Sequence, residues 1–337
     1  MLSDRRQRVL AALIEEYVAR ALPVGSRTLT ERYHLGVSPA TVRNELSVLE
    51  DGGYITQPHT SAGRIPTDYG YRAFVDDLLR TGFAPADDER YRQVAEEMRG
   101  SASELDSLLE QTSSALSRLT DCLSIVLAPS VLNMRIRQIT LVSLTSRRAL
   151  VVVVTEDGQV FNRQMEFSED VLGEDLAAVQ RLLNDALLGK TIRDVEEGLG
   201  RGMYAAFRSP LVRMALDEVL SCLQEGDLSR AHRLGVSSLL TKPEFSQSES
   251  LVPVLEALED NTVLLHIYDD AAQAGDIPYI RIGSENDAEG LSGVSVVASS
   301  YGRGPSMGAI AVIGPTRMDY SKIIQAVRVA RSALDDI

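Results

Sequence analysis

The chain has 337 residues, of which 44% are hydrophobic and 24% are charged, and its formal net charge at pH 7 is −14. This composition is typical of a globular protein of two or three domains, and the longest apolar run, residues 149–154, is too short to cross a bilayer. Two cysteines without a CxxC motif and four scattered histidines argue against a disulfide framework, a zinc finger or another metal site.

The charge is distributed unevenly along the chain. Residues 1–72 contain nine arginines and eight acidic residues, a net charge of +1, whereas the other 265 residues carry 25 basic and 40 acidic side chains. The N-terminal region is therefore the part whose charge least opposes binding to a polyanion. Its first residues, MLSDRRQRVL, lack the apolar core of a signal peptide, so we expect a cytoplasmic protein without membrane contact.

The first 80 residues alternate helical patterns with turn signals. The elements expected there are helices over residues 3–20, from Ser26, from Ser38 with Pro39 at its first position, and after Thr67, and strands over residues 54–56 and 63–65. Gly36 occupies the turn before the third helix and suits a positive φ there. Helix, helix, tight turn, helix and hairpin is the order of a winged helix-turn-helix domain.

The third helix carries hydrogen-bonding side chains opposite its apolar stripe. Arginine pairs with guanine and asparagine with adenine in the major groove, while serine and threonine suit bases or phosphates. The candidate DNA contacts are Ser38, Thr41, Arg43, Asn44 and Ser47 on this recognition helix, and His59, Thr60, Ser61 and Arg64 on the wing. A three-helix unit can also serve as a protein-docking module, which would show no salt-dependent affinity for DNA.

Beyond residue 80 the pattern of elements changes. Residues 81–103 are typical of a linker and the start of a long helix, and residues 168–260 are predominantly helical. Strand-like patterns flank that helical segment, which indicates an α+β unit, formed by residues 104–167 and 261–337, that is interrupted by an insertion.

The α+β unit is expected to contain eight strands and a last helix. The strands are residues 122–128, 137–145, 149–155, 159–167, 263–268, 277–282, 294–300 and 307–313, and the helix covers residues 320–334. The continuous apolar run 149–154 predicts a central strand buried on both faces.

No residue pattern for catalysis is found. The glycine-rich stretch YGRGPSMGAIAVIG (residues 301–314) precedes an apolar strand and lacks the lysine of a phosphate-binding loop, so we interpret it as a hairpin loop. A nucleophile with a neighbouring base is missing as well. The sequence thus predicts no enzyme, no catalytic residue, no cofactor and no metal. Cys122 and Cys222 lie in apolar segments and are expected to be buried thiols.

Three stretches resemble one known family. They are SPATVRNELSVLEDGGYITQPHTSAGRIPTDYGYRAFVDDLL (residues 38–79), IGSEN (residues 282–286) and GAIAVIGPTRMDYSKII (residues 308–324). They resemble the heat-inducible transcription repressor family HrcA. The resemblance implies a multidomain α+β fold with an N-terminal winged helix-turn-helix over residues 1–80, a GAF-like domain over residues 104–167 plus 261–337, and an inserted, mainly helical dimerisation domain over residues 168–260.

The resemblance also implies a function and partners. Proteins of this family repress chaperonin and DnaK-type chaperone operons by binding, as homodimers, the inverted repeat CIRCE in double-stranded DNA, and their active state depends on the GroEL chaperonin. Apolar helical stripes in residues 168–260 are candidates for the dimer interface, although they could equally fill the core of the insertion. The alternative function is a metabolite-responsive winged-helix regulator with a ligand-binding GAF-like domain.

Overall fold

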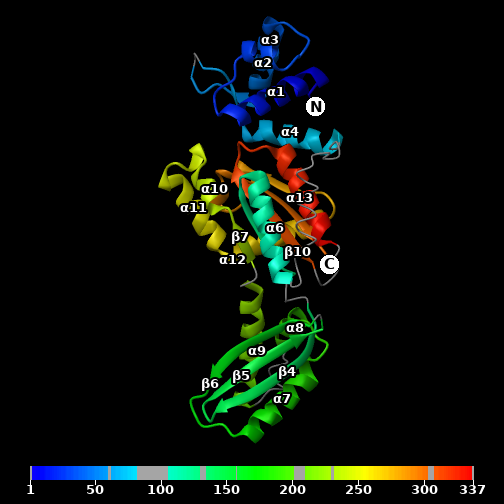
Figure 1. The fold of residues 1–337 in the computed structure, drawn as a ribbon, viewed down its shortest axis with the longest axis vertical. Helices are drawn as coiled ribbons and strands as arrows, with labels where there is room; N and C mark the ends of the chain where they lie inside the picture. Colours follow the sequence, from blue (N-terminus) through cyan, green and yellow to red (C-terminus); the bar gives the residue numbers. More distant parts are fainter. Residues whose placement is uncertain are drawn as a thin grey trace. The chain divides into compact units, whose positions relative to one another are not determined.

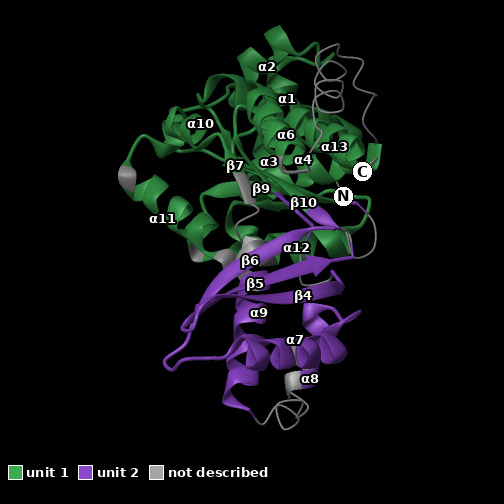
Figure 2. Ribbon diagram, turned by 60° about the horizontal axis from the view of Figure 1, so that its bottom comes forward, with its two compact units in different colours: residues 1–126, 232–301, 309–337 green, residues 127–231, 302–308 purple. Residues whose placement is uncertain are grey.

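The computed structural model describes residues 2–59, 62–81, 105–129, 134–156, 158–200, 209–228, 231–302 and 307–335. The chain divides into two compact units, which Figure 2 colours separately. The first unit comprises residues 1–126, 232–301 and 309–337, and the second comprises residues 127–231 and 302–308. Across the described ranges, none of the helices has both the length and the apolar character needed to span a membrane.

The N-terminal part of the first unit consists of four helices and a short hairpin, as the sequence predicts. The elements are α1 (Asp4–Arg20), α2 (Ser26–Arg32), α3 (Pro39–Asp51), β1 (Ile55–Thr56), β2 (Ile65–Pro66) and α4 (Asp68–Thr81) (Figure 1). The two strands are antiparallel, with Ile55 opposite Pro66. One apolar face of each helix forms the shared core, which includes Val9, Leu13, Leu29, Val42, Leu46, Leu49 and Val75.

The rest of the first unit is built around a five-stranded sheet. The strand order is β7 (Ala231–Leu234), β3 (Leu123–Leu127), β10 (Gly308–Pro315), β9 (Val294–Tyr301) and β8 (Tyr279–Ile282). Every residue of β9 and β10 is buried, so both faces of the sheet are covered at its centre. Helices α12 (Asn261–Ala274) and α13 (Tyr320–Leu334) pack on β9, and α6 (Leu105–Thr120) packs on α13. Helices α10 (Val236–Leu240) and α11 (Ser248–Glu259) connect β7 to α12.

The second unit is a three-stranded antiparallel sheet with helices on one face. Its elements are β4 (Ile136–Thr145), β5 (Arg148–Thr155), β6 (Val160–Glu166), α7 (Gly173–Leu187), α8 (Ile192–Gly200) and α9 (Pro210–Leu228). The free edge of β4 is closed by side chains of α7. Asn184 pairs with both backbone polar groups of Ile139, at 2.9 and 2.7 Å, and the Gln180 side chain accepts a hydrogen bond from the Leu141 amide at 2.8 Å.

The structure corrects two predicted strands. Residues 263–268 belong to α12, in which Leu264, Ile267 and Ala271 recur at helical spacing and are buried. Residues 149–154 do form the central strand of a sheet, but only one face of that strand is fully buried, because its residues alternate between buried and half-buried. A short apolar run is compatible with either structure until its packing partner is known.

The compact units do not follow the predicted boundaries. The sheet β4–β6 was expected to join residues 261–337, but its apolar face is covered by α7 and α9, so it belongs to the unit of residues 127–231. Residues 232–260 pack in the first unit instead. Most of the predicted linker, residues 82–103, lies outside the described residues. The functional roles assigned to the domains stay predictions.

Candidate nucleic-acid interface

The helix α3 begins and is anchored as its sequence indicates. The Oγ of Ser38 accepts a hydrogen bond from the Thr41 amide at 3.2 Å, which caps the helix, and Pro39 follows at the first position. Gly36, with φ of +70°, forms the turn before it. Three residues at helical spacing, Val42, Leu46 and Leu49, are fully buried. The opposite face of α3 is therefore held outward on a rigid element.

That outward face carries the predicted recognition residues. Arg43, Asn44 and Ser47 are exposed, and the hydroxyls of Ser38 and Thr41 lie 3.0 Å from each other at the start of the helix. The Ser47 hydroxyl donates to the backbone oxygen of Arg43, and this bond does not involve the Arg43 guanidinium. Val48, which is 41% exposed, lies on the same face and was not predicted. An apolar side chain there suits contact with a thymine methyl group.

The wing brings together only part of its predicted set. His59 is exposed, whereas Thr60 and Ser61 lie outside the described residues. The Arg64 guanidinium, with its side chain 19% exposed, forms an ion pair with Glu50 at 3.0 Å, and its backbone pairs with Val24. Arg64 thus fastens the wing to α3. A side chain at Gly63 would lie 2.6 Å from the Val24 backbone, so only glycine permits this approach.

The arginines of residues 1–72 divide into paired and unpaired groups. The paired ones are Arg5 and Arg6 with Glu45, Arg20 and Arg32 with Glu16, Arg64 with Glu50, and Arg72 with Asp76 and Glu285. Arg8, Arg27 and Arg43 form no ion pair with any residue in the described ranges. Arg27 is an exposed residue near the start of α2. The sequence does not single it out, because which arginines have a carboxylate partner depends on tertiary contacts.

Glu45 connects α1 to the recognition helix. Its carboxylate, 7% exposed, accepts hydrogen bonds from the Nε of Arg5 at 2.7 Å and the Nε of Arg6 at 2.9 Å. Burial alone would raise the pKa of Glu45, but the hydrogen bonds and charges of the two arginines outweigh burial and hold the pKa below its usual value. The ion pairs therefore stabilise the position of α3 at neutral pH.

Glu45→Gln should weaken this connection in a pH-dependent way. Because the folded-state pKa is lowered, the stabilisation is present above the unfolded pKa of about 4.3 and is lost as the pH falls through the folded pKa. We expect a loss of about 1–2 kcal/mol at pH 7, limited by solvent screening of the half-exposed arginines. Hydrogen exchange of the buried α3 amides measures this loss. The destabilisation by Glu45→Gln should be smaller at pH 3.5 than at pH 7. The control is Glu31→Gln, which makes the same change at an exposed glutamate. A pH-independent loss would contradict the assignment.

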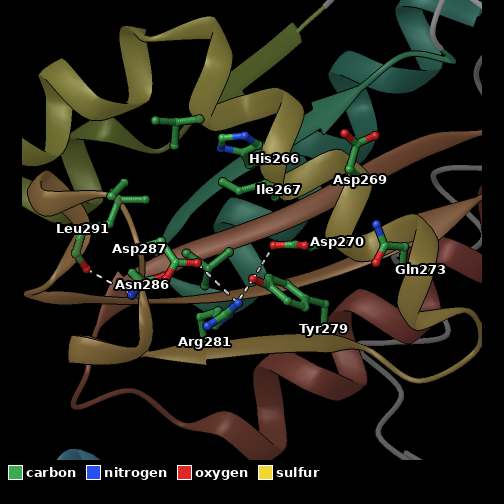
Figure 3. Close-up of a pocket in the computed structure, with 13 residues that line it drawn as sticks. His266, Ile267, Asp269, Asp270, Gln273, Tyr279, Arg281, Asn286, Asp287 and Leu291 are labelled. Atoms are coloured by element: carbon green, nitrogen blue, oxygen red, sulfur yellow. Dashed lines mark hydrogen bonds and ion pairs between the residues drawn. The ribbon is translucent and has the colours of Figure 1, made fainter.

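A cavity of about 340 Å³ lies in the first unit between α12, β8 and the loop that follows β8 (Figure 3). The Tyr279 hydroxyl donates to Asp270 at 2.6 Å and accepts from the Nε of Arg281 at 2.6 Å. Burial and the bond to Asp270 raise the pKa of Tyr279 to about 12, so the hydroxyl keeps its proton at neutral pH. Tyr279, Asp270 and Arg281 therefore hydrogen-bond to one another at the wall of this cavity.

Other chemistry finds little support among the described residues. They contain no group of three or more His, Cys, Asp or Glu side chains placed to hold a metal ion. Cys122 and Cys222 are both buried and form no disulfide, as predicted, and burial raises the pKa of Cys122 to about 11. A thiol with such a pKa stays protonated and unreactive at neutral pH.

Comparison with known proteins assigns the chain to a family. The family model described as "HrcA protein C terminal domain" matches residues 106–324. A heat-inducible transcription repressor HrcA of Nocardioides sp. is 40% identical over 329 residues, covering 97% of this chain and 96% of the relative. The repressor of the same name from Acetivibrio thermocellus is 35% identical over 338 residues, covering 99% and 96%.

One solved structure has the same fold. A crystal structure described as that of a hypothetical protein superimposes with a TM-score of 0.65 at 25% identity, covering 100% of this chain and 98% of that chain. The matches to the two repressors identify a regulator that binds operator DNA. The chain belongs to the heat-inducible transcription repressor family HrcA.

Proposed function

We propose that the chain represses heat-shock chaperone operons by binding the CIRCE inverted repeat as a homodimer, and that the GroEL chaperonin promotes its active state. The observation that carries the DNA part is the outward face of α3, where Arg43 and Asn44 are exposed and Arg43 has no carboxylate partner among the described residues. The dependence on chaperonin rests on family membership.

The proposed DNA contacts divide into base and phosphate contacts. Arg43 and Asn44 read guanine and adenine edges in the major groove, and Ser38, Thr41 and Ser47 bond to bases or backbone beside them. Arg27 binds a phosphate, since it is exposed and unpaired within the described ranges. His59, Thr60 and Ser61 on the wing lie along the duplex, and Arg64 holds the wing in place through Glu50.

The proposed dimer interface is the outer face of the sheet β4–β6. The helical stripes that were candidates for this role, such as Leu176 and Leu183 on α7 and Leu216 on α9, are buried in the unit's own core against the sheet. The opposite face of the sheet carries five aliphatic side chains among polar ones, and the pairing register places Val142 beside Leu150 and Val154 beside Val160. The five side chains are Val142, Leu150, Val152, Val154 and Val160.

Exposure and edge geometry favour a second copy on this face. Val142 is 42% exposed and Val160 is 59% exposed, which is unusual for aliphatic side chains on a continuous sheet face. Because Asn184 and Gln180 close the edge of β4, strand addition at that edge is blocked. A two-fold axis through the face would bury the apolar patch in both copies, and two winged helices then match the two halves of an inverted repeat.

A binding titration tests the proposed function. Fluorescence anisotropy compares a duplex that contains CIRCE with a scrambled duplex, at two salt concentrations, with and without GroEL. We expect selective, salt-sensitive binding that GroEL improves. Selective binding that is indifferent to GroEL would remove the chaperonin from the proposal and favour the metabolite-responsive alternative. A lack of preference for CIRCE by the folded protein would refute the operator assignment.

A further inference from the structure

The IGSEN stretch forms a turn that binds the start of α4. Oδ2 of Asp68 accepts hydrogen bonds from both the backbone amide and the hydroxyl of Ser284, each at 2.9 Å. Gly283 has a φ of +52°, and a side chain at this position would lie 2.3 Å from the same Asp68 oxygen. Only glycine therefore allows the carboxylate to reach the turn.

The next turn of α4 adds a stronger contact. Nε of Arg72 donates to Oε1 of Glu285 at 2.8 Å, and its Nη2 donates to the second Glu285 oxygen and, at 2.7 Å, to the backbone oxygen of Ile280. Neither charged side chain is more than 29% exposed. Glu285 also accepts from the Ile282 amide at 2.9 Å. This forked, two-point pairing fixes direction as well as distance.

The turn itself is rigid. The side-chain amide of Asn286 donates to the backbone oxygens of Gly283, Leu291 and Val294, at 2.9, 3.0 and 2.9 Å. These three bonds hold the turn that carries Ser284 and Glu285 against the start of β9. Movement of the turn would therefore require several hydrogen bonds to break together.

A second set of contacts holds the end of α1. Nη1 of Arg317 donates to the backbone oxygen of Val18 at 2.6 Å, and its Nε pairs with Glu244 at 2.6 Å. The Arg317 side chain is 14% exposed. A cation at the last carbonyls of a helix is also favoured by the helix dipole. Between the two sets, the rings of Tyr71 and Tyr320 pack with centroids 5.7 Å apart, and both are buried.

We propose that Asp68, Arg72 and Arg317 are positioning residues for operator binding, which hold the winged helix in one orientation on the sheet domain. These three residues and their partners Ser284, Glu285 and Val18 form what we call the clasp. Two attachment points on two different helices prevent the rotation that a single point would allow. None of the clasp residues belongs to α3, so the recognition face stays open while the clasp is closed.

The consequence for DNA binding is geometric. In a dimer, a fixed orientation of each winged helix fixes the distance between the two recognition helices, and hence the half-site spacing that both can reach at once. If the clasp is loosened, each winged helix can still bind DNA by itself. Once the first winged helix has bound, however, the effective concentration of the second winged helix at its half-site is lower. This inference rests on the proposed dimeric binding to an inverted repeat.

The test compares Arg72→Ala with Arg80→Ala in the full chain. Both residues are arginines of α4, so both changes remove the same charge. Arg80 pairs with Asp77 of its own helix, whereas Arg72 pairs with Glu285 of the turn, so only Arg72→Ala opens the clasp. We expect Arg72→Ala to lower operator affinity roughly tenfold more than Arg80→Ala, within the range usual for coupled sites. Affinity for a scrambled duplex should fall equally in the two variants.

Two further measurements separate positioning from stability. Glu285→Ala and the double variant should lose no more than Arg72→Ala alone, because all three open the same contact. Insertion of about five base pairs, half a turn of DNA, between the half-sites should weaken wild-type binding more than binding by Arg72→Ala. A winged helix that merely unfolds would also lose scrambled-duplex affinity.

The outcomes distinguish the clasp from the function it serves. Equal losses in Arg72→Ala and Arg80→Ala, additive losses in the double variant, or an unchanged penalty for the insertion would each overturn the positioning role while leaving operator binding intact. If the wild type itself shows no preference for the inverted repeat, the proposed function falls and the clasp proposal falls with it.

Discussion

Arg43→Ala is expected to lower the affinity for the operator by about 1–3 kcal/mol, roughly a five- to 150-fold weaker Kd. Arg43 is exposed on the recognition face of α3 and forms no ion pair with the residues that the structure describes, so its guanidinium is available for a guanine edge. The loss should be specific to the operator, because a base contact carries sequence information and a phosphate contact does not.

The fold should survive this change. The α3 core consists of Val42, Leu46 and Leu49, and the contact that Ser47 makes to Arg43 is to a backbone oxygen, which alanine retains. Thermal unfolding and the oligomeric state should therefore match the wild type. Anisotropy with operator and scrambled duplexes measures the effect on binding.

Two other arginines serve as comparisons for Arg43→Ala. Arg8→Ala removes the same charge from the exposed side of α1 and should cost little. Arg27→Ala should weaken binding to both duplexes and reduce the slope of the salt dependence by about one, as expected for a phosphate contact. If Arg43→Ala behaves like Arg27→Ala, Arg43 contacts phosphate instead of a base.

The sequence predicts the recognition helix well because its signals are local. Ser38 as N-cap, Pro39 at the first position and Gly36 in the turn act within a few residues of one another, and the structure confirms all three. Ion pairing is not local. Glu45 joins Arg5 across 40 residues, and Glu50 engages Arg64 across 14, so the sequence could not indicate which cations are left for DNA.

The middle of the chain was harder to predict for the same reason. The sequence correctly predicted strands at β4, β5 and β6, but which helices cover them depends on tertiary packing. The alternation of Ala149, Val151 and Val153 with less buried neighbours is invisible when every residue in the run is apolar. The IGSEN stretch supported the resemblance to the family, but its contacts with α4 join residues more than 200 positions apart.

Val152→Asp is expected to dissociate the proposed dimer. Val152 lies at the centre of the outer sheet face, opposite Thr140 on β4 and Asn162 on β6. In a two-fold interface the substitution occurs twice, and each buried, uncompensated carboxylate costs about 3–5 kcal/mol. Sedimentation velocity at micromolar concentration should then show a monomer. Operator affinity should approach that for scrambled DNA, because the second winged helix no longer assists the first.

The matched control is Leu182→Asp on α7. Leu182 is 41% exposed on the helical side of the same unit, so it tests the helices as an interface while introducing the same charge. Both substituted side chains point away from the core of the unit, which is formed by the inner face of the sheet and the helical stripes, so both variants should fold. A dimer that survives Val152→Asp but not Leu182→Asp would move the interface to the helices. A dimer that survives both would exclude both surfaces and leave the two winged helices to be paired by another part of the chain.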